Sequence, residues 1–207
     1  MKHRLHPAEI ALMVLAALIL TSGAAALRTR SALADKVVRL HVLANSDSEA
    51  DQALKLKVRD AVLAEATEAL RGTKSREEAG RRLTALLPEL EKTAQSVITE
   101  NGYAYGVRAE LAETPFPTKE YDGFALPAGE YLALRVLIGE AAGQNWWCVV
   151  FPPLCTVAAS DVPAAALDAG LTEQEVALIT EADEGYVLKF KSMELWQALK
   201  DRFAPST

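Results

Sequence analysis

Histidine and cysteine are scarce in this sequence of 207 residues, which contains three histidines and two cysteines. Two of the histidines lie within the first six residues, so the rest of the chain holds His41 as its single histidine. A mononuclear zinc site usually needs three or four ligands from His, Cys, Asp and Glu. His41, Cys148 and Cys155 could supply three, but their spacing matches no known ligand pattern. We therefore expect no metal and no cofactor.

Enzyme motifs are lacking as well. The sequence has no glycine-rich phosphate loop and no GxSxG elbow, and its carboxylates are spaced as on solvated helix faces and turns. A thiolate beside an imidazole is a good nucleophile for acyl transfer, so His41 with Cys148 or Cys155 is a candidate pair. This pair would make the protein an extracytoplasmic Cys-dependent hydrolase or amidase, which is the alternative function. No family-specific signature surrounds either cysteine, and we expect no catalytic residue.

Basic residues are too few for a nucleic-acid partner. The chain has 22 Lys and Arg against 28 Asp and Glu, a formal charge of −6. Without residues 1–26, which hold Lys2, Arg4 and Glu9, 20 basic and 27 acidic residues remain, a formal charge of −7. Proteins bind nucleic acids and anionic bilayer surfaces through clustered Lys and Arg. We expect neither as a partner of the folded part.

The first 27 residues have the pattern of an export segment. Lys2 and Arg4 form a basic start, Ile10 to Leu20 is an unbroken apolar run, and three alanines ending at Ala26 suit signal peptidase. The stretch from Ile10 to Leu27 carries no charge, and it has about the shortest length with which a helix can span a bilayer. Residues 1–27 are therefore a signal peptide or, if retained, a membrane anchor that would be the chain's contact with the membrane. A polar linker is expected at 28–36.

Both cysteines lie in the exported part, where an oxidising compartment favours disulfides. Cys148 and Cys155 would close a small loop in which Pro152 and Pro153 turn the chain, so that the two Cα atoms approach to about 6 Å. The alternative is a pair of buried free thiols.

Hydrophobic periodicity predicts alternating classes of element along residues 37–207, which we interpret as a single domain. Residues 37–43 read as a strand, 49–70 and 76–100 as amphipathic helices with capping Ser-x-x-acid sequences, and Pro88 predicts a kink or break in the second helix. Further strands are expected at 107–111, 121–126, 130–138 and 145–151. Residues 172–182 read as a helix with a Thr172 to Glu175 capping box, 186–191 as a strand and 193–203 as a helix. The predicted fold class is α+β, with a mostly antiparallel sheet. The helical pair and the C-terminal helices pack on one face of this sheet, and the export helix precedes the domain in the sequence.

Two segments stand out. In Arg39 to Asp60, a strand runs into a polar turn and a basic stretch; the turn either caps the helix or forms part of a site. In Asn145 to Cys155, the adjacent Trp146 and Trp147 must point to opposite faces of a strand. Either the sheet is buried on both faces or one tryptophan is exposed as an interface anchor.

These two segments resemble the hallmark stretches of the stage II sporulation protein R family. The resemblance extends to Tyr121 to Glu140 and to Lys189 to Lys200, so it spans the exported part almost end to end. It implies an exported signalling protein, made in the forespore and located in the space between the forespore and mother-cell membranes. Its implied partner is a membrane-embedded aspartic protease of the mother cell, which processes the pro-form of sigma-E. The chain itself would catalyse nothing.

The position of residues in the matching segments gives candidates for receptor binding or for shaping the site. They are Arg39, His41, Asn45, Asp47, Trp146, Trp147, Pro152 and Pro153.

Overall fold

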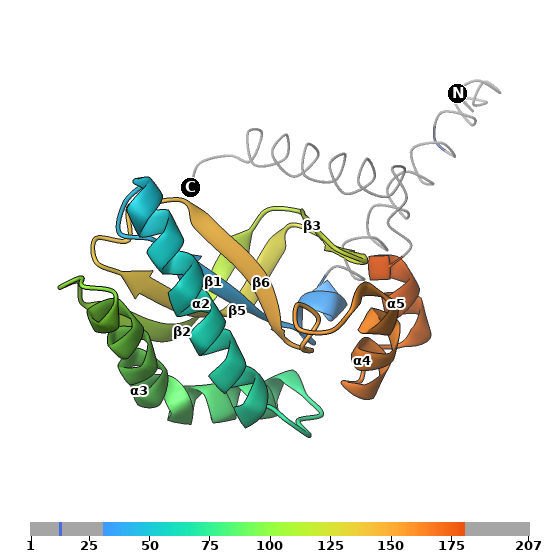
Figure 1. The fold of residues 1–207 in the computed structure, drawn as a ribbon. Coiled ribbons are helices and arrows are strands. Elements are labelled where there is room, and N and C mark those ends of the chain that lie inside the picture. Colours follow the sequence, from blue (N-terminus) through green and yellow to red (C-terminus); the bar gives the residue numbers. More distant parts are fainter. Residues whose placement is uncertain (1–12, 14–30, 181–207) are drawn as a thin grey trace, which may run out of the picture.

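The computed structural model describes Met13 and residues 31–180 (Figure 1). The strands are β1 (Val38–Leu43), β2 (Val107–Phe116), β3 (Lys119–Tyr121), β4 (Phe124–Leu126), β5 (Gly129–Ile138) and β6 (Asn145–Phe151). The helices are α2 (Glu49–Ala69), α3 (Arg76–Glu100), α4 (Val162–Asp168) and α5 (Glu173–Thr180), with a 3-10 turn η1 (Ala159–Asp161). One sheet has the order β2-β5-β1-β6, and β3 and β4 form a second, two-stranded sheet. The α+β class is confirmed.

Strand β1 lies inside the larger sheet and is buried on both faces. Val38, Leu40 and Val42 point to one face and are fully buried. The period of two places Arg39 and His41 on the other face, where they are buried as well. β1 is bonded on one side to β5 and on the other side to β6.

We expected a mostly antiparallel sheet, and the larger sheet is mixed, with two antiparallel pairs of strands and one parallel pair. β2 pairs with β5, and β6 with β1, in antiparallel fashion, but the inner pair β1 and β5 is parallel. Parallel neighbours require a crossover connection. The chain between β1 and β5 supplies one, since it first runs through α2 and α3. Alternating apolar residues locate a strand but do not give its direction.

Helices α2 and α3 cover one face of the sheet and lie side by side (Figure 1). The Ser48 hydroxyl accepts a hydrogen bond from the Asp51 amide, and Ser75 does the same for Glu78, so both predicted caps are confirmed. The stripes of the helices bury Val58 and Leu83, among others, against the β1 face that carries Val38, Leu40 and Val42. These residues form the first core.

Helix α3 contains Pro88 and is continuous through it, so the alternative of a break is wrong. The ribbon bends along its length, as expected where proline removes a backbone hydrogen bond (Figure 1). The helix ends at Glu100 with Asn101 as its C-cap, and Gly102 follows with φ of 82°, a left-handed conformation that glycine adopts without a steric penalty.

The single strand expected at 121–126 is two strands in the structure. Asp122 and Gly123 form a turn between β3 and β4, with Gly123 at φ of 79°. Asp-Gly between apolar residues is a strong signal for a two-residue hairpin. The hairpin lies over the second face of the sheet and packs with Tyr131, Ala133 and others in a second core.

The expectation that all helices pack on one face is wrong. α4, which was not predicted, and α5 contribute Val162, Ala166, Val176 and Ile179 to the second core, together with Val149 of β6. Because Val149 alternates with residues of the first core along β6, these helices close the opposite side of the sheet. The buried face that carries Arg39 and His41 required such a cover.

Three predicted elements lie outside the described residues: the export segment at 1–27 apart from Met13, the strand at 186–191 and the helix at 193–203. Within the segment expected as a linker, residues 31–34 are helical, and Leu33 and Ala34 are buried in the second core. Among the described residues no helix combines the length and the apolar composition needed to cross a bilayer.

Truncation of Leu40 to alanine should lower the free energy of unfolding by about 2 to 5 kcal/mol, because it leaves a cavity under α2 and α3. Urea unfolding measures the change. The matched control is Leu56→Ala on α2, where the side chain is 41% exposed; its effect should stay within about 0.5 kcal/mol. Equal effects at the two positions would contradict the placement of β1.

Candidate functional site

The second face of β1 carries a buried cation among aromatic rings. The Arg39 side chain is fully buried, with its guanidinium carbon 4.0 Å from the ring centre of Phe116 and 4.9 Å from that of Tyr131. These distances are within the range of cation–π attraction, which gains in strength where water is excluded. Phe116 and Tyr131 also meet edge to face at 5.9 Å. The rings therefore provide a large part of the solvation that Arg39 has lost.

The β3–β4 hairpin completes this cluster. Arg39 Nη2 donates a 2.6 Å hydrogen bond to the Tyr121 hydroxyl, and the Tyr121 ring stacks on Phe124 at 4.6 Å. Burial raises the pKa of Tyr121, although the neighbouring Arg39 opposes the rise. Within residues 31–180 no carboxylate pairs with Arg39, and its Nε and Nη1 have no hydrogen-bond partner.

His41 lies two residues along β1 on the same face. Its Nε2 is 2.6 Å from Asn145 Oδ1, and its ring is 5.9 Å from Phe116 and 6.2 Å from Trp147. Burial lowers the pKa of His41 below its usual value, while the bond to Asn145 acts in the opposite direction and nearby Arg135 and Arg39 add to the lowering. His41 is therefore a neutral, packed imidazole at neutral pH.

The tryptophan pair points to opposite faces, as predicted. Trp146 packs beside the first core, with the Arg59 guanidinium of α2 4.7 Å from its ring. Trp147 packs beside the second core, with Lys119 of β3 5.9 Å from its ring. Both rings are half-buried. Each face of the sheet thus presents part of one tryptophan beside a cation.

The polar turn after β1 is held by internal hydrogen bonds. Asn45 Nδ2 and the Ser46 hydroxyl both donate to Asp51 Oδ2, at 2.9 and 2.6 Å. These two bonds, Ser46 first, lower the pKa of the Asp51 carboxyl. Asp47 Oδ1 accepts from the Gln144 amide at 2.7 Å and so ties the turn to the β5–β6 loop. The interpretation of this turn as a helix cap is correct. The turn at residues 45–48 also holds the β5–β6 loop at residues 139–144, and we call these two loops together the clamp.

Two glycines of the β5–β6 loop make the clamp possible. Asn45 Oδ1 accepts from the Glu140 amide at 3.0 Å, and a Cβ on Gly139 would collide with that oxygen. Gly139 also has φ of 56°. A Cβ on Gly143 would collide with the Ser46 carbonyl. The close approach of the two loops therefore requires glycine at both positions.

The cysteines are joined to each other. Cys148 and Cys155 form a disulfide with Cα atoms 6.2 Å apart, and Cys155 Sγ accepts from the Val149 amide. Cys148 is buried in the first core, opposite Leu40 of β1, so it points to the other face of the sheet from His41. The candidate Cys–His pair is not assembled. Pro152 is buried and Pro153 half-buried in the loop that the disulfide closes.

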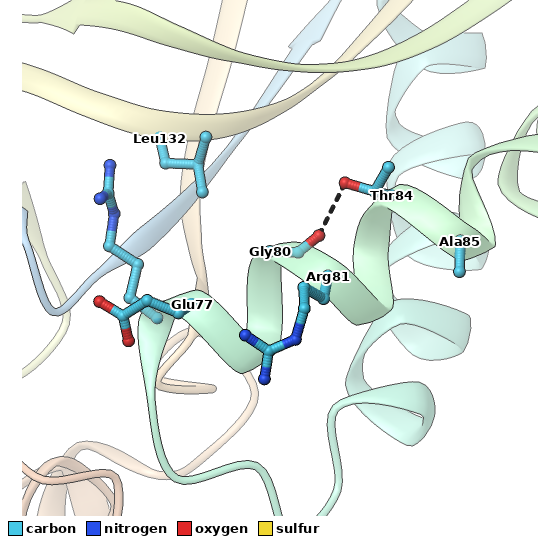
Figure 2. A pocket seen from close by; sticks show the side chains of 7 residues that line it. Glu77, Gly80, Arg81, Thr84, Ala85 and Leu132 are labelled. Carbon is cyan, nitrogen blue, oxygen red and sulfur yellow. Dashed lines mark hydrogen bonds between the residues drawn. The ribbon is translucent and has the colours of Figure 1, made fainter.

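The hollows of the described surface include two that lie beside helices. One, of about 470 Å³, lies along α3 (Figure 2). There Leu132 points from the sheet toward Gly80, and the Thr84 hydroxyl donates to the Gly80 carbonyl at 2.8 Å. The other, of about 310 Å³, lies between the C-terminal end of α2, the disulfide loop and α4. Neither includes His41, and the described residues contain no group of three or more His, Cys, Asp or Glu that could hold a metal ion.

Comparison with known families gives a match over residues 34–161 to the model described as stage II sporulation protein R. The chain belongs to this family. The matched residues include all six strands, α2, α3 and both loops of the clamp. They also include all eight candidate residues of the sequence analysis.

One curated relative is the stage II sporulation protein R of Bacillus subtilis (strain 168), which is 43% identical over 121 residues. The alignment covers 58% of this chain and 54% of the relative, so the chain spans about half the length of the curated relative that it matches. No solved structure matches.

In this member of the family, the eight candidates divide into four places. Arg39, His41 and Trp147 come together on the second face of the sheet. Asn45 and Asp47 lie in the clamp, whereas Trp146 lies on the first face. Pro152 and Pro153 lie at the opposite end of β6.

Four residues that contact Arg39 or His41 were not predicted as site residues from the sequence. They are Phe116, Tyr121, Tyr131 and Asn145. The Asp122-Gly123 turn would have indicated the hairpin that brings Tyr121 to Arg39. The other three follow from the pairing of strands, which the sequence pattern does not give.

The lowered pKa of His41 predicts a pH dependence of stability. The unfolded histidine has a pKa near 6.5 and the folded one a lower value, so below pH 6.5 the unfolded chain binds more protons. The free energy of unfolding should fall as pH drops through this window, by at most about 1.4 kcal/mol per pH unit. Urea unfolding at pH 7.5, 6.5 and 5.5 measures it. His41→Asn should flatten the dependence, and an unchanged slope would refute the assignment.

The clamp predicts a non-additive pair of substitutions. Gly139→Ala should destabilise the protein by more than about 1 kcal/mol, because its Cβ meets Asn45 and its φ is positive. In an Asn45→Ala background the side-chain amide that the new Cβ would meet is absent. The destabilisation by Gly139→Ala should then be smaller, because only its backbone strain remains. A double-mutant cycle by urea unfolding measures the coupling. Strict additivity would show that the two loops do not touch.

Proposed function

We propose that this protein is an exported signal in endospore formation, which activates a membrane-embedded aspartic protease of the mother cell. Activation leads to proteolytic processing of the pro-sigma factor. The protein is made in the forespore and acts in the space between the forespore and mother-cell membranes. The observation that carries this proposal is membership of the stage II sporulation protein R family over the whole mixed sheet and its two large helices.

Three features are consistent with action outside the cytoplasm. The first 27 residues have the composition of an export segment. The disulfide between Cys148 and Cys155 suits an oxidising compartment. The acidic balance of the chain disfavours binding to nucleic acid or to an anionic bilayer.

A ligand activates a receptor by binding one of its states more tightly than another. An aspartic protease built from two halves is active when both carboxylates come together, so a ligand that favours the assembled state raises activity. The gain is limited by the difference in affinity for the two states, about 5.5 kcal/mol for a complete switch from 1:99 to 99:1. The signal needs a rigid, complementary surface for this purpose and no reacting group.

The members of the candidate group that reach the surface are suited to contact the receptor. Trp146 and Trp147 are half-buried rings next to Arg59 and Lys119, and such tryptophans are typical anchors of interfaces. Asp47 is exposed. Arg39, His41 and Pro152 are buried, so their proposed role is to hold the surface in shape.

The alternative, a Cys-dependent hydrolase or amidase, has no observation in its favour. It requires a thiolate beside His41. Cys148 lies on the other face of the sheet and is bonded to Cys155. We therefore retain the signalling function alone.

Reconstitution tests the proposal. Purified protein added to vesicles that carry the protease should trigger cleavage of the pro-sigma factor, and deletion of the gene should leave the pro-form uncleaved in sporulating cells. Trp147→Ala should raise the half-maximal concentration by about 30-fold if this ring is an anchor worth about 2 kcal/mol. Leu56→Ala is the matched control on an exposed apolar side chain. Absence of cleavage with the intact, folded protein would contradict the proposal.

Replacement of both cysteines by alanine separates the two functions in the same assay. A signal should keep its activity at temperatures where it stays folded, with a stability reduced by about 2 to 3 kcal/mol for so short a disulfide loop. A Cys-dependent enzyme would lose activity outright.

A further inference from the structure

We infer that the outer edge of β6 is a docking site for one extended, acidic segment of a protein partner, which adds to the larger sheet as a further strand. The docking groups are the backbone N–H and C=O of Asn145 and Trp147, which we call the open edge. The identity of the partner as the receptor protease rests on the proposed function, whereas the strand chemistry does not.

The backbone groups of β6 alternate between the two sides of the strand. β6 ends the order β2-β5-β1-β6, so one side meets β1 and the other meets no strand of the described sheet. The Val149 amide donates to Cys155 Sγ at 3.1 Å and therefore points away from β1. The register with β1 is regular from Val149 to Asn145. The period of two thus directs the backbone groups of Trp147 and Asn145 to the same outer side.

The open edge is accessible. Asn145 is exposed and Trp147 is half-buried, whereas residues 148–151 are buried. Among residues 31–180, no group outside the pairing with β1 forms a hydrogen bond with the backbone of Asn145 or Trp147. The second half of the edge is different, because Cys155 of the disulfide loop already accepts from Val149. The part of β6 that is left for a partner is therefore its first half.

The opposite edge of the sheet, β2, is closed by its own residues. The Gly106 carbonyl accepts from the Gly139 amide, so the alternation directs the odd-numbered residues of β2 outward. Among these, the Ala109 amide donates to Glu91 Oε1 of α3 at 2.8 Å, and Pro115 has no N–H. Proline and charged side chains keep strand edges from pairing. The sequence of β6, NWWCVVF, contains neither.

The open groups specify an extended chain as the occupant. Donors and acceptors that recur at every second residue along an edge are matched by the backbone of another strand. Trp146 and Trp147 flank the edge on the two faces of the sheet. Alternate side chains of the added segment would therefore pack beside one ring on each face, as cross-strand neighbours do.

The charges beside the open edge favour an acidic segment. Lys119 of β3 lies 5.9 Å from the Trp147 ring, and within the described residues its amine has no carboxylate partner. On the other face, Arg59 beside Trp146 is already paired with Asp60 at 2.6 Å. The uncompensated charge is therefore positive and lies on the second face. A carboxylate of the added segment on that face would be attracted to it.

Amide hydrogen exchange of the purified protein, followed by NMR, tests the open edge itself. The amides of Trp146 and Cys148 face β1 and should be protected by at least about 100-fold. Those of Asn145 and Trp147 should exchange within about tenfold of the rate of an unstructured peptide. Protection of both in the free protein would show that a second copy or another segment of this chain fills the edge, and it would overturn the inference.

A matched pair of substitutions tests strand pairing in the vesicle assay for activation of the protease. Asn145→Pro and Asn145→Ala both remove the side-chain amide, but only proline removes the outward N–H, at a first strand position where proline is tolerated. Asn145→Pro should raise the half-maximal concentration about threefold to tenfold above that of Asn145→Ala. Equal values for the two folded variants would overturn the inference. Failure of the unmodified protein to activate would refute the proposed function instead.

Deuterium uptake of the unmodified protein decides the question if Asn145→Pro does not fold. Binding to vesicles that carry the protease should slow uptake at Asn145 and Trp147, and vesicles without protease should not. Unchanged uptake during activation would overturn the inference.

A charge reversal tests the acidic character of the segment. Lys119→Glu should raise the half-maximal concentration about fivefold at low salt, and the effect should shrink at high salt. Lys92→Glu, at an exposed lysine of α3, is the matched control and should leave the value unchanged. An unchanged value for Lys119→Glu would refute an acidic segment.

Discussion

The structure depends on the burial of β1 on both faces. Val38, Leu40 and Val42 can be kept from water by two amphipathic helices, and α2 and α3 do this. The opposite face carries Arg39 and His41, whose polar groups are unfavourable in a dry core unless something solvates them. A strand of this kind needs a second cover with aromatic and polar groups at defined points. The hairpin, Phe116, Tyr131 and the C-terminal part of the described chain supply that cover.

The chemistry of the second cover explains how two polar side chains are accommodated in the interior. Arg39 is surrounded by rings and bonded to one phenol, and His41 is bonded to an amide. Among residues 31–180, neither is paired with a thiol or a carboxylate. A buried cation whose solvation comes from rings on different strands fixes those strands relative to each other. In this protein the polar groups of the interior therefore specify a shape.

That shape presents different features at different ends of the molecule. The clamp fixes one end of the sheet through Asn45, Asp51 and the glycines of the β5–β6 loop. The disulfide loop fixes the other end, beside the hollow next to α4. The half-buried tryptophans lie between them on β6. Fixed contact points of this kind suit the signalling role that we propose, because a side chain that becomes ordered only at an interface loses entropy on binding.

The sequence by itself determined the local features. The helices over 49–69 and 76–100, their serine caps, the end at Gly102 and the strand at 145–151 follow from propensity, capping and periodicity, which act over a few residues. The opposite orientation of Trp146 and Trp147 follows from the pleat of a strand. Only the tertiary structure decided that β1 and β5 run parallel and that α4 and α5 close the second face. These depend on contacts between residues far apart in the chain, such as Arg39 with Phe116 and Tyr131, and a one-dimensional pattern does not encode which distant strand will be the neighbour.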